Sequence, residues 1–196
     1  MKYKSHALLE SLSEDVRKII LQAGRLESLP AKLLQQQPSA GKWSVAQILD
    51  HLNIYARYYI NAIEGKLHHN QSGADIYFQP GWLGNYFTKI MQPRDDKSIP
   101  NKMQAPKNAV PQPQPDAVKV LREFVSHQHQ LLNLLAIAET ANLNYIRIPT
   151  SLYAFIKLKL GDTFRFLVAH EQRHFVQIEN VLNVVNSGQE LIIVKS

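Results

Sequence analysis

The chain has 196 residues, a formal net charge of +6 and no cysteine. A single domain of this length can bury a sizeable hydrophobic core, and a composition of 45% hydrophobic and 19% charged residues is typical of globular rather than disordered proteins. The lack of cysteine excludes disulfides, zinc knuckles, iron–sulfur clusters and thiol nucleophiles, so any metal must be held by nitrogen and oxygen ligands.

Charge and hydropathy patterning bear on partners and location. The basic residues are scattered and form no dense stripe with aromatic residues, so no nucleic-acid partner is expected. No apolar run is long enough for a membrane span, and acidic residues interrupt the N-terminal apolar stretch, unlike a signal peptide. We therefore expect a cytoplasmic protein with no membrane partner, whose positive charge would attract an anionic small substrate.

The first predicted helix covers residues 5–29, because apolar residues recur there at every third or fourth position. These residues are Leu9, Leu12, Val16, Ile19, Ala23 and Leu26. Pro30 interrupts the helix, and Leu33 and Leu34 indicate one further short turn.

The second predicted helix begins sharply at Ser44. Ser44 and Gln47 have the spacing of a capping box, in which each side chain satisfies a backbone donor of the other residue. The helix is predicted to run to about Glu64, with Gly65 as its C-terminal cap. Its inward face comprises Ile48, Leu52, Tyr55 and Tyr59.

The helical pattern is weaker between residues 66 and 115. Residues 81–91 are compatible with a short helix, whereas five prolines between Pro100 and Pro115 favour an extended strap. The strap is long enough to cross the length of a helical bundle, so we interpret it as a crossover and not as a domain boundary.

Two more long helices are predicted after the strap. Asp116 is a suitable cap for a third helix that ends near Asn142, and the fourth helix is predicted from Asp162 or Thr163 to about Asn186. Residues 153–160 are ambiguous between helix and strand, and the apolar residues 191–194 have no clear assignment. Four amphipathic helices with one long crossover predict an all-α four-helix bundle in a single domain, residues 1–196. Bundle faces often pair, so a homodimer fits this architecture.

Three histidines are the candidate metal ligands. His170 and His174 lie four residues apart, so both project from one face of the fourth helix, together with its apolar stripe. His51 lies on the apolar face of the second helix. Three imidazoles from two helices would give a neutral ligand set with open coordination positions, the composition of a catalytic metal site. Zinc is the first candidate, and nickel, manganese and iron are also compatible.

Two other interpretations remain open for these histidines. A histidine on an apolar stripe is often a hydrogen-bonded core residue, although burying a pair without a partner would be costly. Residues 170–174 also fit the HExxH pattern of zincin proteases, with Glu171 as general base. That match is weak, because the extended pattern needs Gly and His where this chain has Gln177 and Asn180.

Two further residues are candidates for acid–base catalysis. Glu171 could act as a general base, although a surface position is favoured for it. His127 lies close to an apolar stripe of the third helix and is a candidate fourth ligand or acid–base group, with core packing as the favoured alternative. Trp43, Tyr55, Tyr59 and Trp82 are candidates for the walls of a pocket, and core packing is again the alternative.

Two segments resemble the DinB-like, or DinB/YfiT-like, superfamily of metalloenzymes. PSAGKWSVAQILDHLNIY (38–55) has the turn, the Trp-Ser helix start and the histidine within two turns that are typical of its members. LGDTFRFLVAHEQRHFVQIENV (160–181) has the late H-x-x-x-H followed by an aromatic residue and later a glutamine. The resemblance extends over nearly the whole chain.

The resemblance implies a four-helix bundle in which His51, His170 and His174 hold a divalent metal together with water. Members include S-transferases and isomerases that use mycothiol or bacillithiol, so a low-molecular-weight thiol cofactor is also implied. The expected function is a metal-dependent enzyme that activates a bound water or thiol, of the thiol S-transferase or hydrolase type, acting on a small-molecule substrate. The alternative is a non-enzymatic, stress-related bundle that binds a metal or another ligand.

Overall fold

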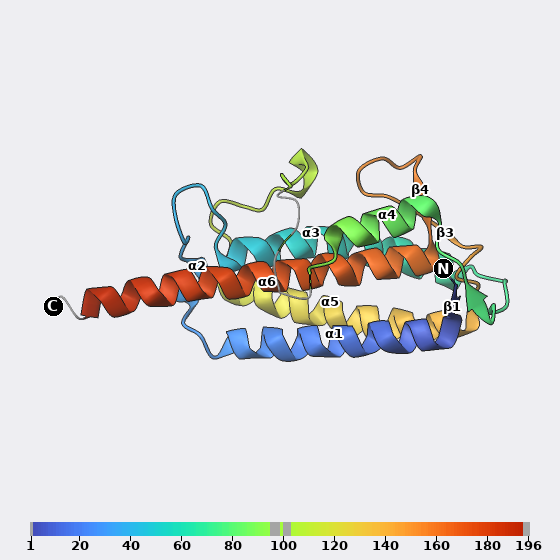
Figure 1. Cartoon of the computed structure of the whole chain (residues 1–196), viewed down its shortest axis with the longest axis horizontal. Helices are drawn as coiled ribbons and strands as arrows, with labels where there is room; N and C mark the ends of the chain where they lie inside the picture. Colours follow the sequence, from blue (N-terminus) through green and yellow to red (C-terminus); the bar gives the residue numbers. More distant parts are fainter. Residues whose placement is uncertain (1, 95–98, 100–102, 194–196) are drawn as a thin grey trace.

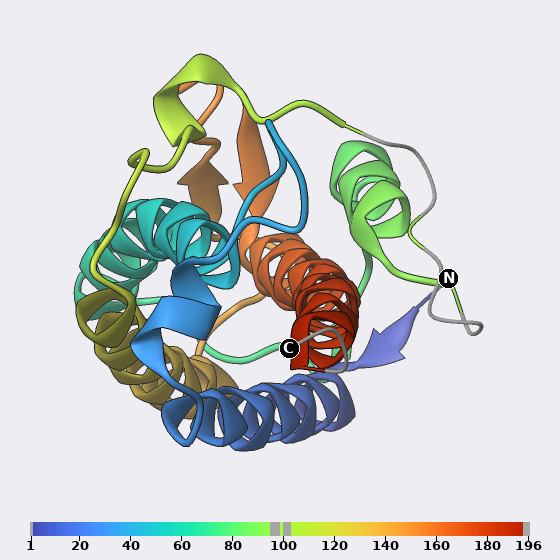
Figure 2. The same cartoon turned by 90° about the vertical axis from the view of Figure 1, so that its left-hand side faces the viewer.

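The computed structural model describes residues 2–94, 99 and 103–193, and the side chains of residues 188–193 lie outside this description. Four long helices lie side by side along the molecule (Figures 1 and 2). They are α1 (Ser5–Glu27), α3 (Val45–His68), α5 (Ala117–Ile137) and α6 (Leu160–Ile193). Helix α1 contacts α5 and α6, and α3 contacts the same two helices, which closes the ring seen end-on in Figure 2. The predicted all-α four-helix bundle is confirmed.

Short elements occupy the ends and one side of the bundle. They are α2 (Ala31–Gln35), α4 (Trp82–Met91), the 3-10 turns η1 (Lys107–Ala109) and η2 (Ala138–Thr140), and the strands β1 (Tyr3–Lys4), β2 (Tyr77–Phe78), β3 (Arg147–Pro149) and β4 (Lys157–Lys159). Strand β1 pairs with β2 and β3 pairs with β4, both antiparallel. None of the helices in the described part of the chain is both long and apolar enough to cross a membrane.

The local signals of the first half of the chain predicted most helix starts correctly. Helix α1 begins at Ser5, and α2 follows Pro30 as one short turn. The capping box is present, because the Ser44 hydroxyl accepts from the Gln47 backbone N–H at 3.2 Å and the Gln47 side chain accepts from the Ser44 N–H at 3.0 Å. The predicted cap at Gly65 is wrong: α3 continues to His68, which buries Leu67 in the hydrophobic core.

The second half differs more from the prediction. Helix α5 ends at Ile137, earlier than the predicted Asn142, and α6 extends from Leu160 to Ile193, beyond both predicted ends. Residues 157–159, which were ambiguous in the sequence, form strand β4, because pairing with β3 satisfies their backbone groups. The apolar segment 191–194 is helical as far as Ile193, and Val194 lies outside the described residues.

The long connection between α3 and α5 is the predicted crossover. Its later part lies on the N-terminal half of α3, where the Gln47 side chain donates to the carbonyl of Pro113 at 3.1 Å and Asp50 accepts from the Gln112 N–H at 2.8 Å. Its middle part forms α4, which packs on α6. The crossover therefore covers two neighbouring helices of the bundle, and these are the helices that carry the three candidate ligands.

A layer of polar side chains divides the bundle interior into two hydrophobic clusters. One cluster is built around Leu9, Ile63, Leu135 and Phe164, and the other around Ile19, Ile48, Phe124 and Ile178. The residues of the layer are His51, Asn53, His127, Gln128, His170, Glu171 and His174, all 9% exposed or less. Because buried polar groups need hydrogen-bond partners or ligands, this layer is the part of the core where chemistry is expected.

Close packing of α4 on α6 depends on Gly84. A Cβ atom at this position would lie 2.3 Å from Cγ of Asp162, a carboxylate that accepts from the Gly81 N–H at 2.8 Å and pairs with Arg165 at 3.3 Å. We expect Gly84→Ala to lower the free energy of unfolding by about 2 kcal/mol through overpacking. Gly24→Ala on α1 is the matched control, since no atom lies within 4 Å of its added Cβ; it should stabilise the helix by about 0.8 kcal/mol. Urea denaturation of both variants checks the contrast, and equal effects would contradict it.

Candidate metal centre

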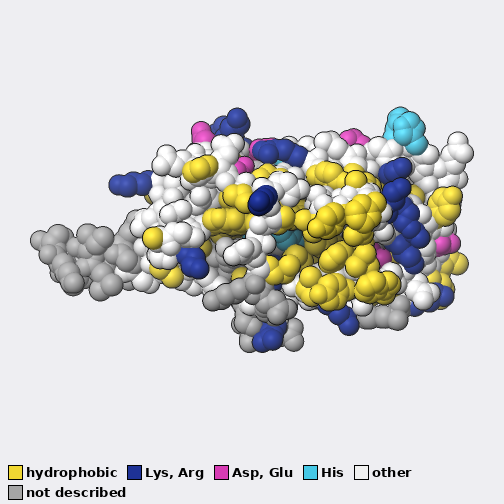
Figure 3. Space-filling view, turned by 90° about the horizontal axis from the view of Figure 1, so that it is seen from above, with side chains coloured by type: hydrophobic (Ala, Val, Ile, Leu, Met, Phe, Trp, Pro, Cys, Tyr) yellow, Lys and Arg dark blue, Asp and Glu magenta, His cyan; other side chains and the backbone are white. Residues whose placement is uncertain are grey.

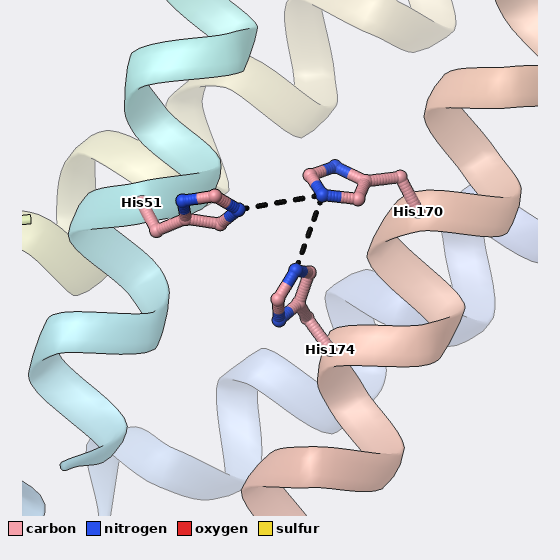
Figure 4. Close-up of side chains that lie close together, drawn as sticks. All are labelled: His51, His170 and His174. Atoms are coloured by element: carbon pink, nitrogen blue, oxygen red, sulfur yellow. Dashed lines mark hydrogen bonds between the residues drawn. The ribbon is translucent and has the colours of Figure 1, made fainter. Parts of the chain in front are cut away.

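The three predicted ligands meet at one point inside the bundle. His51 projects from α3, and His170 and His174 project from successive turns of α6 toward it (Figure 4). Nε2 of His170 lies 3.4 Å from Nε2 of His51 and 3.1 Å from Nε2 of His174. All three side chains are buried, and their potential ligand atoms lie within 4.8 Å of one another.

Hydrogen bonds from outside the cluster fix two of the rings. Nδ1 of His51 lies 2.6 Å from the carbonyl oxygen of Ala109, and because a carbonyl only accepts, Nδ1 carries the hydrogen. Nδ1 of His174 likewise donates to Oε1 of Gln177 at 2.9 Å. In both neutral rings the lone pair is therefore on Nε2, the atom that faces the other histidines. This is the arrangement by which second-shell partners orient metal-binding imidazoles.

Burial keeps the three imidazoles neutral. It lowers the pKa of His51, lowers that of His174 to about 3, and lowers that of His170 well below its ordinary value. The neighbouring histidines lower the pKa of His170 and His174 further, since each charged ring would repel the next. Neutral rings with converging lone pairs repel one another unless a proton or a cation lies between them.

The donor set fits a divalent transition metal. Two nitrogens bound at roughly 2.1 Å to one tetrahedral zinc ion are about 3.4 Å apart, close to the observed separations from His170. Three imidazole nitrogens also suit nickel, and iron or manganese less strongly. His51, His170 and His174 would hold the ion, and the side of the cluster that faces the cavity described next would stay open to other ligands.

A cavity of about 990 Å³ adjoins the three histidines. Of the four predicted wall residues, Trp43, Tyr55 and Tyr59 line it, and the fourth, Trp82, does not, because its side chain is 82% exposed on the outer face of α4. Figure 3 looks onto this side of the molecule, where hydrophobic side chains gather over α4 and the β3–β4 connection. The ring of Tyr55 lies 4.5 Å from that of His170, so the aromatic wall reaches the metal-binding atoms' own layer.

Neither candidate acid–base residue lies in the cavity wall. Glu171 is only 6% exposed, which corrects the favoured surface position, and its Oε1 accepts from Nε2 of Gln128 at 2.9 Å. Burial raises the pKa of the Glu171 carboxyl to about 8. It faces α5, because a residue next to His170 in the sequence points about 100° away from it around the helix. A catalytic role for Glu171 stays a prediction.

His127 is packed at the boundary between α3 and α5, as the alternative interpretation expected. Its Nδ1 lies 3.1 Å from Oδ1 of Asn53, whose amide donates to the carbonyl of Val120 at 2.9 Å. Its Nε2 is 3.9 Å from Glu123, which forms a two-pronged ion pair with Arg57. His127 is not among the histidines of the cluster, and a catalytic role for it also stays a prediction.

Sequence reasoning missed three groups of the centre. The Ala109 carbonyl is in the proline-rich strap, where nothing in the sequence marks a single backbone oxygen. Gln177 lies three residues after His174, a spacing that places the two side chains on one helix face and could have indicated the contact. Arg173, which also lines the cavity, carried no distinguishing signal.

A four-helix bundle with a buried centre of three neutral histidines, open to a cavity, defines a class of candidate metal-binding proteins. The sequence profile of the DinB superfamily matches residues 6–178, and the chain belongs to this superfamily. Comparisons with curated proteins and with solved structures each gave no significant match. Family membership and the three-histidine cluster together fit a metal-binding DinB-like protein.

Proposed function

We propose that the protein is a metal-dependent enzyme of the thiol S-transferase or hydrolase type, acting on a small molecule in the cavity beside the three histidines. The observation that carries this proposal is the convergence of three Nε2 lone pairs from His51, His170 and His174 at a cavity wall. A closed, four-ligand structural site would not need an adjoining cavity.

A divalent ion in this centre would supply positive charge that lowers the pKa of a neighbouring water or thiol. The protein supplies the remaining parts. The Ala109 carbonyl and Gln177 hold two imidazoles in the tautomer that presents Nε2. Neutral imidazoles leave the charge of the ion undiminished, unlike carboxylate ligands, and the aromatic wall excludes water from the reacting groups.

Tyr55 is the residue best placed to donate a hydrogen bond to a bound substrate. Its ring lies beside His51 and His170, with centroid separations of 5.1 and 4.5 Å, and it lines the cavity. Burial raises the pKa of its hydroxyl to about 12. The hydroxyl therefore keeps its proton at neutral pH, so it can donate to a developing negative charge and cannot serve as a base.

One observation favours the alternative, a non-enzymatic protein that binds a metal or another ligand. Among the described residues that line the cavity there is no Asp or Glu, and both Glu171 and His127 lie outside the wall. The cavity thus offers no carboxylate base for hydrolysis. Thiol transfer needs no such base once the thiol is ionised, so the transferase version of the proposal is the stronger one.

The test is turnover of chemically simple substrates by the metal-loaded protein. Bacillithiol, mycothiol and glutathione are offered with 1-chloro-2,4-dinitrobenzene, in which the thiolate displaces chloride, and 4-nitrophenyl acetate tests hydrolysis. We expect metal-dependent turnover with one of the thiols, and His51→Ala should lower kcat/KM by about 100-fold or more. His129→Ala is the control, since His129 is exposed on α5. Stoichiometric metal binding without turnover of any substrate would favour the non-enzymatic alternative.

A further inference from the structure

The cavity is polar at one end and apolar at the other, and α6 sets this order. Its residues at three- and four-residue spacing line the cavity in the sequence Phe166, His170, Arg173 and Gln177. At 1.5 Å per residue, Phe166 and Arg173 are separated by about 10 Å along the helix axis. The histidines lie between an aromatic residue on one side and a cationic residue on the other.

The apolar end is a continuous aromatic wall. The Phe166 ring lies 5.9 Å from that of Tyr59 and 6.3 Å from that of Phe87, so residues of α3, α4 and α6 share it. Leu158 of β4 and Leu152 of the β3–β4 connection extend this wall. These contacts leave a space suited to an apolar body rather than to a sugar or a nucleotide, whose hydroxyls would lack partners there.

The polar end carries positive charge. Arg173 is buried, with 6% of its surface exposed, and its Nη1 donates to the carbonyl of Ile90 at 3.4 Å, which places the guanidinium where α4 meets α6. Lys42 lines the same cavity, as do the amides of Gln177 and Asn180. With no acidic side chain among the described lining residues, the end of the cavity near Arg173 attracts anions.

We propose that the cavity binds an amphipathic anion, with its apolar body against Phe166, Tyr59 and Phe87 and its anionic group at Arg173. The substrate class is thus a hydrophobic molecule bearing one carboxylate, sulfonate or phosphate about 10 Å from its apolar end. A bound molecule of this kind passes the histidine cluster between its two ends. That the reaction occurs there rests on the proposed function, whereas the binding itself does not.

A matched pair of fluorescent probes tests the charge requirement. The anionic probe is 8-anilinonaphthalene-1-sulfonate, and the uncharged probe is N-phenyl-1-naphthylamine, which has nearly the same ring system. We expect one anionic probe per chain, displaced by octanoate at least ten times more readily than by 1-octanol. Both proteins, metal-loaded and chelator-treated, are titrated, because a ligand anion could otherwise bind the ion directly.

Four variants locate the two ends of the ligand. Arg173→Gln should weaken the anionic probe about tenfold and change the uncharged probe less than twofold, whereas Arg173→Lys should keep most of the preference. Phe87→Ala should weaken both probes, since it removes apolar wall. Arg17→Gln is the control, because Arg17 is exposed on α1 and does not line the cavity. Circular dichroism and metal content are measured for each variant.

The outcomes separate this inference from the proposed function. An unchanged anion preference in a folded Arg173→Gln protein would overturn the inference, and so would a preference that disappears when the metal is removed. Anion binding that persists in His51→Ala, in a protein that turns over no thiol substrate, would support the inference while the proposed function fails.

Discussion

Replacing His170 with alanine is expected to weaken metal binding by at least 100-fold. Its Nε2 is the atom within 3.4 Å of both other imidazoles, so its loss leaves two ligands that are joined only through the wider separation in the cluster. Removing one ligand of a three-nitrogen site costs about 3 kcal/mol or more of binding free energy. The measurement is a competition titration with a chromophoric chelator, using zinc and nickel in turn.

The same experiment gives the stoichiometry. The wild-type protein, purified without chelators, should contain about one divalent ion per chain by elemental analysis, and His170→Ala should contain almost none. His129→Ala, on the exposed face of α5, should match the wild type. A wild-type protein that takes up neither zinc nor nickel would remove the metal-dependent function, and the three histidines would then be polar core residues sharing protons.

Glu171→Gln is expected to stabilise the metal-free protein, and more so as the pH rises. Two buried acceptor atoms, Oε2 of Glu171 and Oε1 of Gln128, have no hydrogen-bond partner, although the two side chains are joined by one hydrogen bond at 2.9 Å. A proton on the carboxyl, or an amide in its place, supplies the missing donor. Burial accordingly raises the pKa of Glu171 from 4.5 to about 8.

The sign of the pH dependence follows from that shift. Between pH 4.5 and about 8 the unfolded chain has lost the Glu171 proton and the folded protein has kept it, so the folded state binds more protons and loses stability as the pH rises. The loss is about 1.4 kcal/mol per pH unit, or roughly 3 kcal/mol between pH 5 and 7. Glu171→Gln removes this dependence and should therefore be the more stable protein at pH 7.

Urea denaturation of chelator-treated protein at several pH values checks the prediction. Glu64→Gln, an exposed position on α3, is the control and should follow the wild type at every pH. A constant difference in unfolding free energy between wild type and Glu171→Gln, independent of pH, would show that Glu171 is ionised in the folded protein. The variant also tests the zincin interpretation, in which Glu171 is a general base: full turnover by Glu171→Gln would exclude it.

The metal-binding residues could be predicted because their signal is local. The four-residue spacing of His170 and His174 places both on one helix face whatever the rest of the fold, and the apolar neighbours of His51 indicate a buried face. The capping box at Ser44 and the break at Pro30 are equally local, since they depend on backbone groups within one turn. These features give a helical bundle with three inward imidazoles.

Helix α6 shows where such patterns fail. Glu171 and Arg173 lie beside the histidines in sequence and read as residues of a solvated face, yet both are 6% exposed. Glu171 is covered by α5 of the bundle, and the side of α6 that carries Arg173 is covered by α4, a helix of the crossover. A helix packed on several sides buries polar residues that amphipathic periodicity assigns to water.

The sequence by itself determined which helices form and which histidines point inward, because capping and helical periodicity act over a few residues. Only the tertiary structure decided that α3 and α6 bring the three rings together, that the strap places the Ala109 carbonyl on His51, and that a cavity with an aromatic and a cationic end adjoins them. Those contacts join residues 58 or more positions apart for His51 and Ala109, and 119 for His51 and His170. Packing of whole elements sets such distances, and no local rule of the chain contains them.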